Sequence, residues 1–125
     1  MAMQYVKVRA DRVKEATLFE GLNDVTLAGT GTGFRLFSDT CQDGDQFDYA
    51  ITHPGTDEWE TGVGVYDGQS NVVIRQTITA SSNNGAKVSF SAGSKQIFIT
   101  VNSQSLADYD RTLVRATALA VALGY

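Results

Sequence analysis

The sequence predicts a mainly β domain, a compact β-sandwich or small barrel of about seven to eight short strands with a C-terminal α-helix. Along residues 4–101, short segments of alternating apolar and polar residues are separated by turns rich in Gly, Asn, Asp and Ser. Alternation with a period of two is typical of half-buried strands. After Asn102 the chain becomes rich in Ala and Leu, which favour helix. The 125 residues suit one domain.

The clearest predicted strand is 46–52, in which Phe47, Tyr49 and Ile51 share one face. The other predicted strands are 4–9, 11–19, 25–28, 57–66, 72–79, 88–91 and 95–101. Apolar side chains expected on one face of the strand 72–79 are Val72, Ile74 and Ile78. Strands so close together in sequence favour hairpin pairing, for example between 46–52 and 57–66.

The segment 57–66 carries the most information. Its alternation predicts a core face made of Trp59, Thr61, Val63 and Val65. The opposite face would carry Glu58, Glu60, Gly62, Gly64 and Tyr66. Glycine weakens a strand and often marks a place where another group comes close. We therefore expect a close approach at Gly62 and Gly64, and a buried Trp59.

A helix is predicted over residues 105–123. Ser105 begins a variant of the capping box, with Asp108 in the place of the usual Glu or Gln. An apolar stripe along this helix gives the candidate binding residues for assembly, namely Leu106, Tyr109, Leu113, Leu119 and Leu123. Residues 1–103 would form the β-domain and 104–125 a helix for packing or assembly. The sequence leaves open whether the helix packs on its own sheet, on other copies or on a neighbouring protein.

Several classes of function are disfavoured by composition. The net charge of -4 and the scattered basic residues argue against nucleic-acid binding. No apolar run is long enough to span a membrane, and we expect no signal peptide. Cys41 cannot form an internal disulfide, and His53 is the only histidine, so we expect no catalytic residues and no cofactor. The acidic stretch Asp43 to Asp48 lacks the length of a calcium loop, so no metal site is predicted.

Two acids on the predicted outer face allow a different hypothesis. Glu58 and Glu60 would lie about 6.8 Å apart along the strand. That spacing is compatible with a glycosidase pair, but a solvated strand face is the commoner explanation, and we expect no enzyme. With Tyr66, the same two acids could instead form a small carbohydrate-binding site for recognition of a host surface.

Several motifs occur in a characteristic order: DRVKE at 11–15, GFR at 33–35, WETGVGVY at 59–66, ASSN at 80–83 and VSFSAGSKQIF at 88–98. Over residues 10–101 the chain thereby resembles a small all-β module of tailed bacteriophages, found in tail-fibre, tail-tip and other minor virion proteins. The module often heads longer proteins. Here a helix follows it, which favours an adaptor over direct binding to the host.

The resemblance implies a virion structural protein, located on the tail or head surface and assembled in the cytoplasm of the bacterial host. It would act by protein–protein assembly at a tail fibre, tail tip or baseplate, with other virion proteins as partners. A homo-oligomer is expected, with a trimer preferred. A capsid decoration or head-fibre protein is the alternative within the same class.

Overall fold

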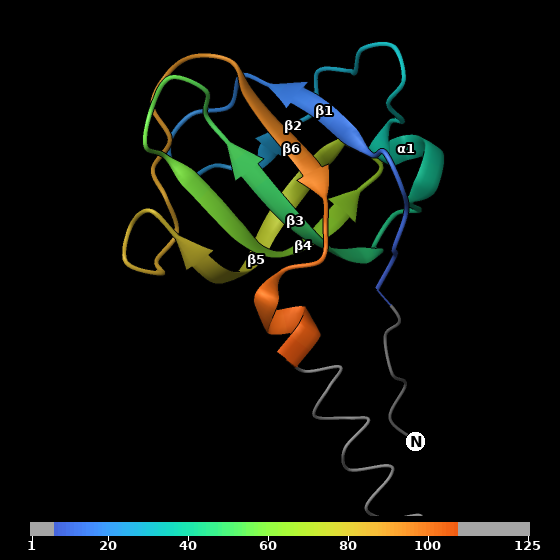
Figure 1. The fold of residues 1–125 in the computed structure, drawn as a ribbon. Helices are drawn as coiled ribbons and strands as arrows, with labels where there is room; N and C mark the ends of the chain where they lie inside the picture. Colours follow the sequence, from blue (N-terminus) through green and yellow to red (C-terminus); the bar gives the residue numbers. More distant parts are fainter. Residues whose placement is uncertain (1–6, 108–125) are drawn as a thin grey trace, which may run out of the picture.

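The computed structural model describes residues 7–107, which form a six-stranded antiparallel sheet that curls into a nearly closed barrel (Figure 1). The strands are β1 (Lys14–Thr17), β2 (Val25–Thr26), β3 (Gln46–Thr52), β4 (Trp59–Asp67), β5 (Val72–Ser81) and β6 (Lys95–Ile99). Their order in the sheet is β1-β6-β3-β4-β5-β2. The mainly β, barrel-like class predicted from the sequence is confirmed, with fewer strands than expected.

Two hydrogen bonds close the gap between the edges of the sheet. The backbone of Ala16 in β1 donates to Gly29 O at 2.8 Å and accepts from Ala28 N at 2.9 Å. Residues 28 and 29 follow β2, so the free side of β1 is paired with the chain that leaves the other edge strand. A closed edge leaves few backbone groups open to pairing with other chains.

Two predicted strands, 4–9 and 88–91, are not formed by the residues of them that the structure describes. Residues 7–9 run as an extended arm outside the sheet, with Val8 N donating to Gln46 O at 2.7 Å. Residues 88–91 make only an isolated bridge, between Phe90 and Gly21. A short helix that the sequence did not predict, α1 (Phe37–Thr40), lies beside β1 (Figure 1) and buries Phe37 completely.

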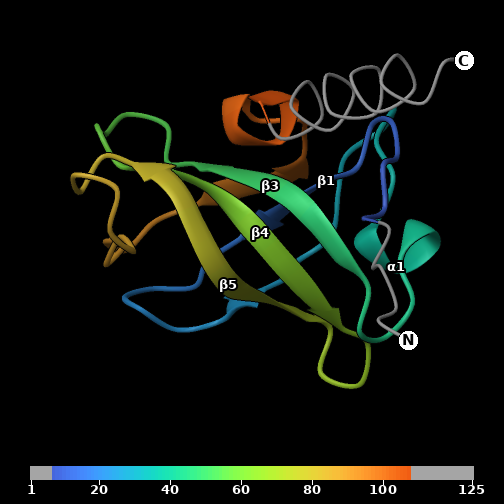
Figure 2. The same cartoon turned by 90° about the horizontal axis from the view of Figure 1, so that it is seen from below.

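The interior of the barrel is filled by apolar residues from several strands and loops, and only some of them were predicted for the core. Phe47, Tyr49 and Ile51 of β3 are fully buried, as the alternation predicted. Figure 2 shows β3, β4 and β5 side by side, with β1 on another side of the barrel. Other fully or almost fully buried apolar side chains are Val13, Val25, Phe37, Val73 and Ile97.

The predicted orientation of β4 is wrong. Its buried residues are Glu60, Gly62, Gly64 and Tyr66, whereas Trp59 is 42% exposed. The strand β5 is turned in the same way, since Val73 and Arg75 point inward and Ile74 is exposed. The two errors are linked, because β4 and β5 are paired and neighbouring side chains on paired strands share a face.

The close approach predicted at the two glycines of β4 is confirmed, although the approaching groups belong to the protein's own core. A side chain at Gly62 would meet Thr77 O and the Tyr49 hydroxyl. A side chain at Gly64 would meet Val73 and Phe47. The glycines thus make room for large core residues that cross the barrel.

The C-terminal helix begins earlier than predicted. Residues 103–107 are helical, and the Asn102 side chain accepts a hydrogen bond from Ser105 N at 2.8 Å. Asn102 is therefore the capping residue in place of Ser105. The segment leaves the barrel at its lower end in Figure 1. The rest of the predicted helix lies outside the described residues.

Candidate functional site

The most buried ionisable groups form a network inside the barrel. The Glu60 carboxylate accepts hydrogen bonds from Arg75 Nη1 at 3.0 Å, Val88 N at 2.9 Å and the Tyr49 hydroxyl at 2.6 Å. Both side chains of the Glu60–Arg75 ion pair are completely inaccessible to solvent. A buried charge pair is tolerated when further hydrogen bonds satisfy it. Here every polar side-chain atom of the pair has a partner except Arg75 Nε, which is buried without one.

Arg75 also connects the network to two loops. Its guanidinium donates to the carbonyl oxygens of Val88 at 2.9 Å, and of Gly21 and Asn23 at 3.0 Å each. The guanidinium carbon lies 5.0 Å from the centre of the Phe19 ring. Burial, together with the hydrogen bond to Glu60, raises the pKa of the Tyr49 hydroxyl and keeps it protonated. The side chains of Glu60, Arg75 and Tyr49 are buried, so none of them is exposed to a ligand from solvent.

The acid Glu58 is bound to two loops at the mouth of the barrel. Its Oε1 accepts from His53 Nδ1 at 2.6 Å and from the Ser91 hydroxyl at 3.0 Å, and Ser91 N also donates to it at 3.1 Å. The hydroxyl of Ser91 thus contacts the acid and not the imidazole, unlike the nucleophile–base–acid order of a catalytic triad. The hydrogen bond from His53, with those from Ser91, lowers the pKa of Glu58.

We expect the stability of the protein to depend on Glu58 in mild acid. A carboxyl whose pKa is lowered by folding stabilises the protein above its unfolded pKa, about 4.3, and this contribution is lost as the pH falls through the folded value. The variant Glu58→Gln should therefore be less stable than the parent at neutral pH, and the two should converge as the pH falls through the lowered pKa of Glu58. Urea unfolding across this pH range measures the effect.

The matched control for that experiment is Asp57→Asn, which removes an exposed carboxylate from the same loop. It should leave the pH dependence of the parent unchanged. If Glu58→Gln and the parent stay equally stable at every pH, the hydrogen bonds to His53 and Ser91 contribute nothing to stability, and the role assigned to Glu58 is wrong.

The residues predicted for carbohydrate binding do not form an exposed site. Tyr66 is 4% exposed, and its hydroxyl donates to Asn71 Oδ1 at 2.8 Å. Glu60 is buried in the network, and Glu58 is bound to His53 and Ser91. The sequence suggested that the two acids lie on a solvated strand face, and this prediction is wrong. The buried Tyr66 offers no ring on which a sugar could stack.

One candidate assembly residue, Leu106, lies within the described residues, and it is exposed. Its side chain is 55% exposed, and that of Val101, just before the helical segment, is 49% exposed. With Arg9 and Ser105 they line a shallow hollow of about 190 Å³. The other candidates, Tyr109, Leu113, Leu119 and Leu123, lie outside the described residues. This hollow, which we call the helix root, is an apolar surface at the point where the C-terminal segment leaves the barrel.

The N-terminal arm borders the helix root and is held by charge. Asp48 of β3 is almost fully buried, and its carboxylate pairs with Lys7 Nζ at 3.0 Å and Arg9 Nη1 at 3.3 Å. Thr100 N, just after β6, donates to the Asp48 carbonyl at 3.0 Å. The arm and the start of the C-terminal segment therefore lie against the same part of β3.

A second surface was not predicted from the sequence. A groove of about 510 Å³ is lined by Arg12, Lys14, Phe34, Thr52, Gln96 and Phe98, with Val13 and Ile99 beneath them. The Phe34 ring lies 4.2 Å from the Arg12 guanidinium carbon and 3.9 Å from Lys14 Nζ. Such distances are those of cation–π contacts. We call this surface the cation–aromatic groove.

Two of the sequence motifs meet at this groove. Arg12 and Lys14 come from DRVKE, and Phe34 comes from GFR. The two segments are joined by a parallel bridge in which Arg35 N donates to Arg12 O at 2.7 Å and Lys14 N donates to Arg35 O at 3.2 Å. The carboxylate of Glu15, the last residue of DRVKE, accepts hydrogen bonds from Phe37 N in α1 and from Gly29 N, and so fixes both segments. The charged motif DRVKE was the one sequence signal that could have pointed to this groove. Its aromatic partner, Phe34, comes from a distant segment of the chain.

Other chemistry-bearing groups are scattered. Cys41 is buried, and burial raises the pKa of its thiol, which keeps it protonated. Within residues 7–107 no three potential metal ligands cluster. In the same part of the chain no helix is long and apolar enough to cross a membrane.

No family model, curated protein or solved structure matches the chain.

Proposed function

We propose that the chain is a structural protein of a bacteriophage virion, an attachment or adaptor component of a tail fibre, tail tip or baseplate that acts by protein–protein assembly. The observation that carries the proposal is the helix root, where Val101 and Leu106 expose apolar side chains beside the charged arm. The motif resemblance over residues 10–101 supports the virion class.

The distribution of polar groups supports assembly over ligand turnover. Glu60, Arg75 and Tyr49 are buried in the network, and Glu58 is bound to loop residues. Six large apolar side chains of the described residues stay exposed: Leu18, Leu22, Trp59, Ile74, Val101 and Leu106. Fully burying one such side chain in an interface contributes about 1.5–3 kcal/mol. A few of them at one contact are enough to bias association.

The partners in this proposal are other virion proteins and further copies of the chain, with a trimer as the preferred symmetry. Appendages of a particle are built on rotational symmetry, so a homo-oligomer suits the role. A capsid decoration or head-fibre protein would use the same surfaces at a different place in the particle.

Removal of residues 108–125 should leave a folded β-domain that no longer enters particles. The described barrel has its own buried core, and the predicted apolar stripe lies beyond it. Circular dichroism of the truncated chain, measured beside its incorporation into particles in an infected host, tests this. A truncated chain that folds and is incorporated normally would remove the assembly role of this segment.

A point variant separates the helix root from the segment that follows it. Leu106→Glu places a charge in the exposed apolar hollow and should reduce incorporation without unfolding the domain. The matched control is Ser103→Glu, an exposed position on the same helical turn, which should incorporate like the parent. Equal incorporation of both variants would show that the helix root makes no contact in the particle.

A further inference from the structure

We propose that the cation–aromatic groove of one copy receives the acidic loop 54–58 and Trp59 of a second copy, so that copies associate head to tail. The proposal rests on the assembly function above and names one of its contacts. It is carried by two unusual surfaces on the same chain, one basic and aromatic, the other acidic and aromatic.

The groove is a basic site on an acidic protein. Arg12 and Lys14 flank it, and none of its described lining residues is acidic. The chain as a whole has fourteen acidic and ten basic residues. No ion pair between either cation and a described carboxylate accompanies the Phe34 contacts, which leaves both charges open to an anion. The floor of the groove, with Phe34 and Phe98, suits an aromatic side chain next to that anion.

The loop between β3 and β4 offers a matching group. Asp57 is exposed, and its carboxylate makes no hydrogen bond or ion pair with the described residues. Trp59, two residues further along, is the only tryptophan of the chain. Its surface is 42% exposed. Tryptophan is one of the residues enriched at interface hot spots.

The loop is already ordered for binding. His53 O accepts hydrogen bonds from Thr56 N at 3.1 Å and from the Thr56 hydroxyl at 2.8 Å. Glu58 N donates to the same hydroxyl at 3.1 Å, while the Glu58 carboxylate is bound to Ser91. Asp57 is thus the carboxylate left to the partner, and little conformational entropy would be lost when it binds.

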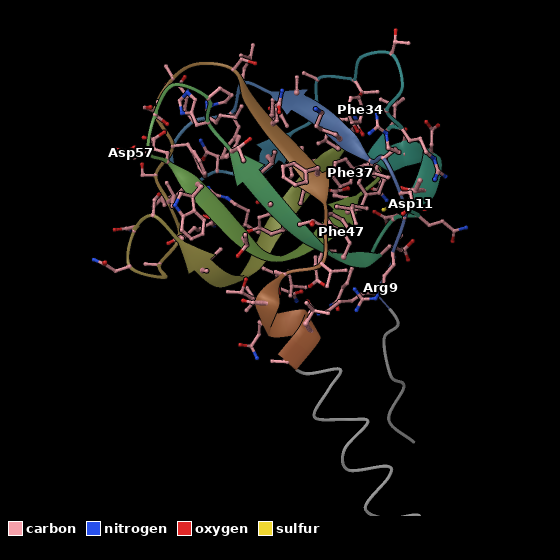
Figure 3. The ribbon with its side chains drawn as sticks, in the orientation of Figure 1. Arg9, Asp11, Phe34, Phe37, Phe47 and Asp57 are labelled. Carbon is pink, nitrogen blue, oxygen red and sulfur yellow. The ribbon has the colours of Figure 1, made fainter. Side chains whose placement is uncertain are left out.

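Asp57 cannot reach Phe34 within one copy, although Trp59 is paired with Thr52 at the edge of the groove. Figure 3 places Asp57 on one flank of the barrel and Phe34 on the other. A contact between them therefore joins different copies through different surfaces, which is a heterologous contact. Such contacts form closed rings when the rotation between copies closes, and filaments when it does not. Closure after three copies would give the trimer expected from the resemblance.

Charge reversal in the full-length chain tests the contact. Lys14→Glu and Asp57→Lys should each weaken self-association at least about tenfold, because each places like charges together. The double variant Lys14→Glu/Asp57→Lys should recover association, since the opposite charges are restored with their places exchanged. Trp59→Ala should also weaken association while the circular dichroism spectrum stays that of the parent. Sedimentation equilibrium over a range of protein concentrations measures all of these.

Matched controls are Lys87→Glu and Asp24→Lys, which reverse charges elsewhere on the barrel and should associate like the parent. A monomeric parent at high concentration would overturn the proposal. So would single variants that associate like the parent, or a double variant that is not recovered. If Lys14→Glu dissociates the copies and Asp57→Lys does not, the groove binds a different acidic segment, which also overturns the proposed contact.

An acidic polysaccharide is the competing occupant. The parent and Asp57→Lys both keep Lys14. In titrations with such a polysaccharide, neither should bind more than Lys14→Glu does. Binding that Lys14→Glu abolishes would overturn the proposal. Failure of this contact is distinguishable from failure of the assembly function. If the assembly function fails, the parent chain is missing from particles, whatever its oligomeric mass in solution.

Discussion

Replacing Arg75 with methionine is expected to lower the free energy of unfolding by about 3–5 kcal/mol. The change leaves the Glu60 carboxylate charged and buried without its cation, and it removes the donor for the carbonyls of Val88, Gly21 and Asn23. A domain of this size has a total stability of about 5–15 kcal/mol, so the loss is a large part of it. Urea unfolding followed by circular dichroism measures the change.

The double variant Glu60→Gln/Arg75→Met separates the charge from the hydrogen bonds. It removes both charges, while the oxygen of the new amide can still accept from Val88 N and its NH2 group can donate to the Tyr49 hydroxyl oxygen. We expect it to be more stable than Arg75→Met alone. If Arg75→Met costs less than about 1 kcal/mol, the network does not hold the loops as described.

Replacing Gly62 with alanine should be almost as damaging, because the new methyl group has no space. It would overlap Thr77 O on the neighbouring strand and lie 2.9 Å from the Tyr49 hydroxyl. The pairing of β4 with β5 also shifts register between Thr61 and Gly62. Overpacking of this kind typically costs about 1–3 kcal/mol, and a clash with backbone belongs at the upper end. The same unfolding measurement tests it.

Gly31→Ala is the matched control, because nothing lies within 4 Å of its new methyl group and its backbone is not left-handed. It should be as stable as the parent. Equal stability of Gly62→Ala and Gly31→Ala would mean that β4 and β5 can separate without cost, which the close approach of the two strands at Gly62 does not allow.

The sequence predicted strands better than it predicted their orientation. The alternation in β3 gave the correct face because its large apolar residues, Phe47, Tyr49 and Ile51, all lie on one side. In β4 the same period exists on both faces, and the apolar face is the outer one. The inner face needs Gly62 and Gly64 to admit Tyr49, and Glu60 to pair with Arg75. Hydrophobicity alone therefore selected the wrong side.

Buried charges explain most of what the sequence could not reveal. Glu60, Arg75 and Lys95 read as surface residues in any local pattern, yet all three are buried. Burial lowers the pKa of the Lys95 ammonium group, whose hydrogen bond goes to the nearby carbonyl of Gly93. The partners of Glu60 and Arg75 come from other strands and loops, so only the folded arrangement brings them together.

The candidate surfaces were predictable to different degrees. Leu106 was identified from the apolar stripe, and it is exposed at the helix root. The cation–aromatic groove was missed because Arg12 and Lys14 are separated in sequence from Phe34, and the bridge that joins them is formed by tertiary structure. Trp59 was assigned to the core because a large aromatic residue in an alternating strand is usually buried.

The most direct test of the proposed function is to locate the chain on the particle. A labelled antibody against residues 7–107 should decorate intact virions at one position, at the tail tip, the fibre base or another attachment point. The number of labels per particle should be constant, as expected for a component built on rotational symmetry. If purified virions carry no label while the chain is abundant in the host cytoplasm, the protein is not a virion component and the proposed function is wrong.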